Sequence, residues 1–219
     1  MIANSLIQPE YPTVKLTDST NYVLDLMTEY KVSHLPVVDK TKHLIGIVSE
    51  EDVLENNVPK IGESKIIFAR VYTKATHHIY EVLKIVSDYK LSLIPVIDED
   101  EKYIGSISLS ILTQQFAKLT SLQNAGGIIV LELNVNDYSM AEVAQITEAN
   151  GAKIVSSYIT PHTDSTKLEL TIKLNETDLT RVIKAFIRFE YVIQASFHES
   201  EFIDELKDRY DNFMRYLNI

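Results

Sequence analysis

Ser49 and Asp52 place a hydroxyl and a carboxylate three positions apart, at the start of an expected helix. A serine becomes a catalytic nucleophile when a general base activates it on a strand-turn elbow, and this chain has no such motif. The same Ser-x-x-acid spacing also forms a capping box, in which both side chains satisfy free backbone N–H groups of the helix. The pair therefore leaves two alternatives open, a binding site or a helix cap.

The histidines favour neither metal binding nor catalysis. His77 and His78 are adjacent, so their side chains diverge and cannot chelate one ion in the i, i+4 manner. His43, His162 and His198 are scattered among turns and strand ends, and we expect them to be surface residues. The chain has no cysteine, which excludes thiolate metal sites, disulfides and cysteine nucleophiles. We expect no enzyme activity, no catalytic cofactor and no metal site.

The segment around Ser49 occurs twice. Residues 35–52, LPVVDKTKHLIGIVSEED, return as residues 94–111, IPVIDEDEKYIGSISLSI. The offset is constant, because 95 less 36 and 105 less 46 both give 59. The residues that mark this offset are Pro36 and Pro95, and Gly46 and Gly105. No insertion separates the copies, which indicates a duplicated supersecondary unit.

Each copy is predicted to fold as strand, helix, strand, strand, helix. In the first copy we expect strands at residues 13–16, 35–38 and 44–48, a helix after Ser19, and a second helix from Ser49. The second copy covers about residues 68–119. The predicted buried helix faces are Val23, Leu26, Met27 and Tyr30, and then Ile79, Val82, Val86 and Tyr89.

The motif hydrophobic-Pro-Val-Val-Asp, followed by Gly-Ile-Val-Ser-Glu-Glu-Asp at residues 46–52, resembles a CBS domain. A tandem pair resembles a Bateman module, and the resemblance covers about residues 1–123. It implies a regulatory module that senses an adenosine-containing ligand, and it implies no catalysis. The alternative is a ligand-independent module in which both repeats only dimerise or assemble.

The resemblance also implies roles for individual residues. Ser49 would bind ribose or phosphate oxygens, and Asp52 would accept from both ribose hydroxyls, as a carboxylate can. Gly46, which has no side chain, would let the backbone come close to the ligand. The other predicted ligand-binding residues are His34, Ser33, Leu35 and Thr13.

The second copy departs from this pattern. Ser108 is present, but Ile111 replaces the acid and cannot accept a hydrogen bond. The loss of a charge-assisted bond worth about 1.5–3 kcal/mol predicts one ligand per chain. Glu50 and Glu51 disfavour a bare triphosphate beside the first site, so AMP or another adenosine compound of low charge fits better than ATP.

After a break at residues 124–127, the predicted order is β-α-β-β-α-β, which is ferredoxin-like. Its size and its turn into the first helix resemble an ACT domain, and the whole chain resembles the CBS-ACT proteins of the acetoin-utilisation type. ACT domains carry a glycine at this turn to admit an amino acid, and residues 136–140 have none. Asp137 and Ser139 can cap the helix instead. The predicted face of the second helix is Leu179, Val182, Ile183, Phe186 and Ile187.

The sequence thus predicts an α/β (α+β) protein with three parts. Residues 1–124 form the tandem pair (1–60 and 61–124), residues 127–198 the ACT-like domain, and residues 199–219 an amphipathic helix that must pack to persist. The apolar face of that helix is Phe202, Leu206, Tyr210, Phe213 and Leu217.

The composition of the chain limits which partners and which cellular location we expect. The net charge of −10 argues against nucleic acid, and no apolar stretch approaches the length of a membrane span. We expect a cytoplasmic homodimer that regulates an unknown protein.

Overall fold

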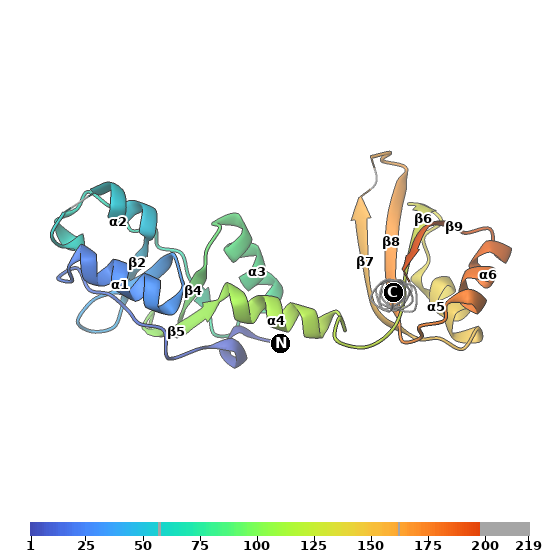
Figure 1. Cartoon of the computed structure of the whole chain (residues 1–219), viewed down its shortest axis with the longest axis horizontal. Helices are drawn as coiled ribbons and strands as arrows, with labels where there is room; N and C mark the ends of the chain where they lie inside the picture. The colour runs from blue at the N-terminus through green and yellow to red at the C-terminus, as the bar shows by residue number, and fades with distance from the viewer. Residues whose placement is uncertain (57, 162, 198–219) are drawn as a thin grey trace, which may run out of the picture. The chain divides into compact units, whose positions relative to one another are not determined.

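The structure, a computed structural model, describes residues 1–56, 58–161 and 163–197 (Figure 1). It divides into two compact units, Met1–Gln115 and Phe116–Ile219. The helix predicted at residues 199–219 lies outside the described residues. The protein is a mixed α/β protein, as predicted.

The first unit contains both repeats. Its elements are η1 (Ala3–Leu6), α1 (Thr20–Tyr30), β1 (His34–Val38), β2 (Leu44–Ser49), α2 (Glu50–Asn56), η2 (Ile61–Glu63), β3 (Thr73–Lys74), α3 (Ile79–Asp88), β4 (Leu93–Ile97) and β5 (Tyr103–Ser108); α4 (Leu109–Leu119) continues into the second unit. The strands β1 and β2 form one antiparallel hairpin, and β4 and β5 form the other. The predicted helices and hairpin strands are therefore present in both copies, whereas the first predicted strand is a single bridge in one copy and two residues long in the other.

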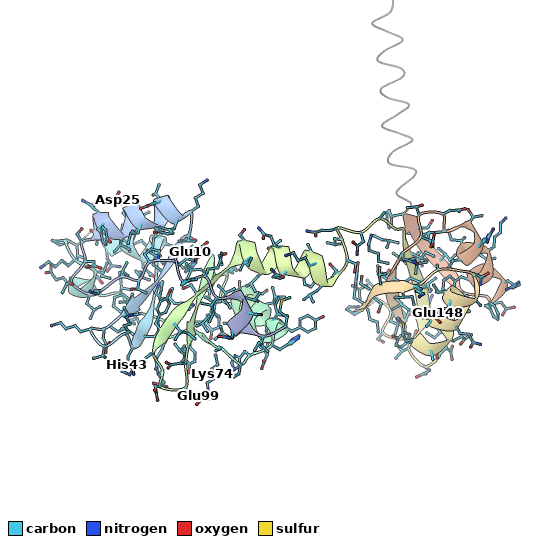
Figure 2. All side chains as sticks on the ribbon, turned by 90° about the horizontal axis from the view of Figure 1, so that it is seen from below. Glu10, Asp25, His43, Lys74, Glu99 and Glu148 are labelled. Carbon is cyan, nitrogen blue, oxygen red and sulfur yellow. The ribbon has the colours of Figure 1, made fainter. Side chains whose placement is uncertain are left out.

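The duplication extends to the conformation of each hairpin turn. The Asp39 carboxylate accepts the backbone N–H groups two and four residues later, at 2.8 and 2.9 Å. Asp98 makes the same two contacts, both at 2.9 Å. Lys42 and Glu101 adopt left-handed φ angles of 67° and 62°. His43 and Glu99, near the two turns, lie at the same edge of the first unit (Figure 2).

Each repeat has its own apolar core. Val23, Leu26 and Met27 of α1 pack in the first core, and Ile79, Val82 and Val86 of α3 pack in the second. Tyr89, predicted to extend the second face, is instead 58% exposed, because α3 ends at Asp88.

The short strand predicted at residues 13–16 is reduced to one parallel bridge between Val14 and Val37. Its counterpart in the second repeat, β3, is only two residues long. The Val14 N–H donates to the Pro36 carbonyl, and the Val14 carbonyl accepts the Val38 N–H, both at 2.9 Å, so this segment still lies beside β1.

The opening segment of each repeat crosses to the hairpin of the other repeat. Gln8 bridges Ser106 of β5, and Ala69 bridges Ile47 of β2. The first of these segments forms the short helical turn η1, whose Ala3 and Leu6 are buried in the core of the second repeat.

The second unit has the predicted β-α-β-β-α-β order. Its elements are β6 (Ile128–Asn134), α5 (Met140–Ala149), β7 (Ile154–Pro161), β8 (Lys167–Leu174), α6 (Thr180–Arg188) and β9 (Val192–Phe197). The antiparallel sheet has the order β7-β8-β6-β9, and both helices pack on one face of it, in the ferredoxin-like arrangement (Figure 1). Ile187, predicted on the buried face of α6, is 61% exposed, because it lies in the last turn, beyond the apolar contacts of Val182 and Phe186.

Candidate functional site

Ser49 and Asp52 meet where β2 passes into α2. The Ser49 hydroxyl donates to Asp52 Oδ2 at 2.5 Å, and the Ser49 N–H reaches the same oxygen at 3.4 Å. The Asp52 N–H donates to Ser49 Oγ at 3.1 Å. This is the predicted capping box, and it uses only one carboxylate oxygen. In the described part of the chain, no donor bonds to the other oxygen, Oδ1, so a cap and a binding site are compatible here.

His34 lies opposite Ser49 across the first hairpin. Its Nδ1 accepts the backbone N–H of Ser92 at 3.2 Å. Because that N–H can only donate, Nδ1 carries no proton, and the neutral ring is protonated on Nε2. Burial lowers the pKa of His34 from its ordinary value of 6.5, and the negative charge of Asp52 opposes that shift. A neutral N–H donor and a carboxylate therefore stand close to each other.

Ser33 and Ser92, which occupy equivalent positions in the two repeats, bond directly. The Ser33 N–H donates to Ser92 Oγ at 3.0 Å. A cavity of about 330 Å³ opens at this junction, lined by the end of α1, Lys31, Ser33, Glu50 and Ser92. Ligand sites usually begin at about 300 Å³, so this cavity is large enough for a small molecule.

The other predicted ligand-binding residues are placed differently. Leu35 is fully buried in the first core and offers no side-chain surface to a ligand. Thr13 is half-buried, next to the bridge from Val14. At Gly46, a Cβ atom would lie 2.8 Å from the Phe68 carbonyl oxygen, so the glycine admits the chain that links the repeats.

Ser108, the counterpart of Ser49, has a different acceptor. Its hydroxyl donates to Gln8 Oε1 at 2.7 Å, and its N–H reaches the same oxygen at 3.3 Å. Ser108 is 3% exposed, whereas Ser49 is half-buried. The contact of Gln8 could not be predicted from the sequence, because no local spacing links residues 8 and 108. Ser92 is also absent from the predicted site residues, although its offset of 59 from Ser33 is a usable signal.

The turn before α5 behaves partly as predicted. Ser139 caps α5 by accepting the Glu142 N–H at 3.3 Å, whereas Asp137 accepts from the Asn134 amide at 2.9 Å. A cavity of about 390 Å³ lies here, and its lining includes Glu132, Asp137, Glu142, Glu190, Lys167 and Tyr191. Burial, and then the charge of Glu142, raises the pKa of Tyr191. This mostly acidic lining disfavours the carboxylate of an amino acid.

The adjacent histidines have separate structural contacts. His78 is the N-cap of α3, in a capping box with Glu81, and His77 Nδ1 lies 3.1 Å from Thr73 Oγ1. Among residues 1–56, 58–161 and 163–197, no group of three or more His, Asp or Glu side chains is placed to hold a metal ion. No helix formed by these residues is long and apolar enough to cross a membrane.

Comparison with known proteins identifies the repeats. A family model described as the CBS domain matches residues 3–58 and 69–117. A homoserine O-acetyltransferase from Methanosarcina acetivorans is 27% identical over 120 residues, which are 54% of this chain and 22% of that protein. The match thus spans about a fifth of the relative's own length.

Two solved structures have a similar fold over half of the chain. A CBS domain pair/ACT domain protein from Thermotoga maritima has a TM-score of 0.49 at 20% identity, covering 54% of this chain and 98% of that one. CBSX2 from Arabidopsis thaliana, solved in complex with AMP, has a TM-score of 0.48 at 21% identity, covering 53% and 96%. With its two matched segments, its constant offset and its paired hairpins, this chain carries a tandem pair of CBS domains.

Proposed function

We propose that the CBS pair is a regulatory module that binds an adenosine-containing small molecule of the AMP type at the first repeat. The observation that carries the proposal is the state of Asp52. Its Oδ2 is held by Ser49, which fixes the carboxylate, while Oδ1 has no donor among the described residues. A fixed carboxylate with an open oxygen suits the adjacent hydroxyls of a ribose.

The surrounding groups narrow the ligand class. His34 offers a neutral N–H donor, and Ser33 and Ser92 offer hydroxyls. In the part of the chain that the structure describes, Lys31 is the one cation that lines the neighbouring cavity, and Glu50 lies there too. One positive charge beside an acidic helix start suits a single phosphate or none, and disfavours a triphosphate. AMP, the compound bound to CBSX2, is the first ligand to test.

A change at this site on ligand binding could reach the second repeat through hydrogen bonds between the repeats. The bonds that Ser92 makes with His34 and Ser33 cross between the repeats, and α4 leaves the second repeat for the second unit. We propose that the second unit is an ACT-like output domain, and that the chain works as a homodimer. Light scattering should give about twice the monomer mass of 24.9 kDa, and a monomer at micromolar concentration would refute the dimer.

Calorimetry with AMP, adenosine and ATP tests the proposal. The wild-type chain should bind AMP or adenosine at one site and ATP more weakly. Asp52→Asn keeps an acceptor for the cap but removes the charge, so affinity should fall about ten- to a hundredfold, equivalent to about 1.5–3 kcal/mol.

Glu51→Gln is the matched control, since it removes one carboxylate from the same helix at an exposed position. Affinity for AMP should not fall in this variant. If none of the compounds binds, the ligand-independent assembly module is favoured. If both variants lose the same affinity for AMP, Asp52 acts only through its negative charge and does not contact the ligand.

A further inference from the structure

We infer that Gln8 takes the place of the acid that the second repeat lacks, and thereby closes the second cleft, by which we mean the position beside Ser108 that corresponds to the first cleft beside Ser49 and Asp52. In the first repeat, Asp52 Oδ2 accepts from Ser49 Oγ at 2.5 Å and from the Ser49 N–H at 3.4 Å. In the second, Gln8 Oε1 accepts from Ser108 Oγ at 2.7 Å and from the Ser108 N–H at 3.3 Å. The two serines keep the same pair of donor bonds, although the acceptors come from unrelated parts of the chain.

Backbone bonds and packing contacts hold the segment around Gln8 in place. The position of the Gln8 side chain beside Ser108 is therefore fixed by the fold. The Gln8 N–H donates to the Ser106 carbonyl at 2.8 Å. Just before it, Ala3 and Leu6 are buried in the second core. Ile7 also fills the space beside Gly105, where a Cβ atom would lie 2.3 Å from Ile7 Cγ2. This glycine therefore admits the segment that carries Gln8.

The exchange of an acid for an amide fits the burial of this position. Ser108 is 3% exposed, and Ile111 packs partly buried against the second core. A carboxylate at position 111 would have to lose water there, which is costly for a charge. An apolar residue at 111 together with a neutral amide from residue 8 satisfies the serine without burying that charge. Gln8 thus leaves no open acceptor for a ribose at Ser108.

A double-mutant cycle tests the exchange without any ligand. In the wild-type background, Ile111→Asp adds a carboxylate whose serine partner already bonds to Gln8, so the melting temperature of the first unit should fall. In the Gln8→Ala background, the new carboxylate can accept from Ser108, so the fall should be smaller by about 2–4 °C. Asn4→Ala, at an exposed position in the same segment, should leave the effect of Ile111→Asp unchanged. Additive effects of Gln8→Ala and Ile111→Asp would overturn the inference.

Thiol labelling tests the closure, because the chain has no native cysteine. Ser108→Cys should react slowly with a maleimide, and Gln8→Ala should accelerate that reaction at least about tenfold if the amide is the cover. Ser49→Cys should react readily with or without Gln8. Fast labelling of Ser108→Cys while Gln8 is intact would show that the cleft is open.

A final arm rests on the proposed function. The Gln8→Ala, Ile111→Asp double variant should gain a second, weaker AMP site, whereas neither single variant should gain one. If AMP fails to bind the wild-type chain, the proposed function fails, while the melting cycle and the labelling still decide the role of Gln8. If the wild-type chain binds one AMP and the double variant also binds one, Gln8 does not close a second site.

Discussion

The two clefts of the CBS pair share a hairpin, a turn and a serine, and they differ in where the serine finds its acceptor. In the first, the acceptor is Asp52, three residues along the next helix; in the second, it is Gln8, which lies 100 residues away. Both solutions satisfy the backbone at the helix start. Among the described residues, Asp52 Oδ1 has no donor, whereas Gln8 Oε1 accepts both serine donors. The proposed ligand site is therefore expected in the first repeat and not in the second, although the fold is duplicated.

The largest expected effect is that Gln8→Ala lowers the stability of the fold and Asp52→Asn lowers the affinity for AMP, each without the other change. Gln8→Ala leaves a buried hydroxyl and N–H without their acceptor, which should cost about 1–3 kcal/mol of unfolding free energy. Its affinity for AMP at the first site should not change. Asp52→Asn should do the reverse, losing affinity at little cost in stability, because an acceptor remains for the half-buried Ser49. Denaturant unfolding measures the stability of the two variants, and calorimetry measures their affinity for AMP. If both variants lose stability and affinity to the same extent, the two clefts do not differ in the way described.

A second prediction concerns the glycine of the first cleft. In Gly46→Ala, the new Cβ would lie 2.8 Å from the Phe68 carbonyl oxygen and 2.9 Å from its carbonyl carbon, so the linker between the repeats must shift. Overpacking of this kind should lower the unfolding free energy by about 1–3 kcal/mol. A melting temperature equal to that of the wild-type chain would mean that the linker is free to move away.

The sequence predicted the framework of this comparison but not its outcome. The offset of 59 and the apolar spacing located both hairpins and their helices, because those patterns are local. They could not supply Gln8, whose contact with Ser108 depends on how the first segment crosses to the other repeat. The apolar spacing predicts buried faces that include Tyr89 and Ile187, and both are exposed, because a helical stripe does not show where the packing stops. At Ser49 the structure shows the cap, while contact with a ligand stays a prediction that the cap does not exclude.

The smallest expected effect is a pH dependence at the junction of the repeats. The pKa of His34 is lowered from 6.5 in the folded chain by burial. As the pH falls below 6.5, the unfolded chain takes up the proton first, so this contribution to stability is present above 6.5 and is lost towards the lower folded pKa. The wild-type chain should therefore lose more melting temperature than His34→Leu between about pH 7.5 and about pH 5.5.

Leucine is the matched substitution, because Leu93 holds the equivalent position in the second repeat. If the melting temperatures of the wild-type chain and His34→Leu depend on pH in the same way, protonation of His34 is not the cause of the loss of stability.

Hydrogen exchange with and without AMP tests the asymmetry of the clefts most directly. Bound AMP should slow exchange in peptides that cover residues 31–35 and 46–53, and should leave residues 105–112 unchanged. That result would locate the ligand at Asp52. Equal protection of both segments, or protection confined to residues 105–112, would contradict an open first cleft beside a second one closed by Gln8.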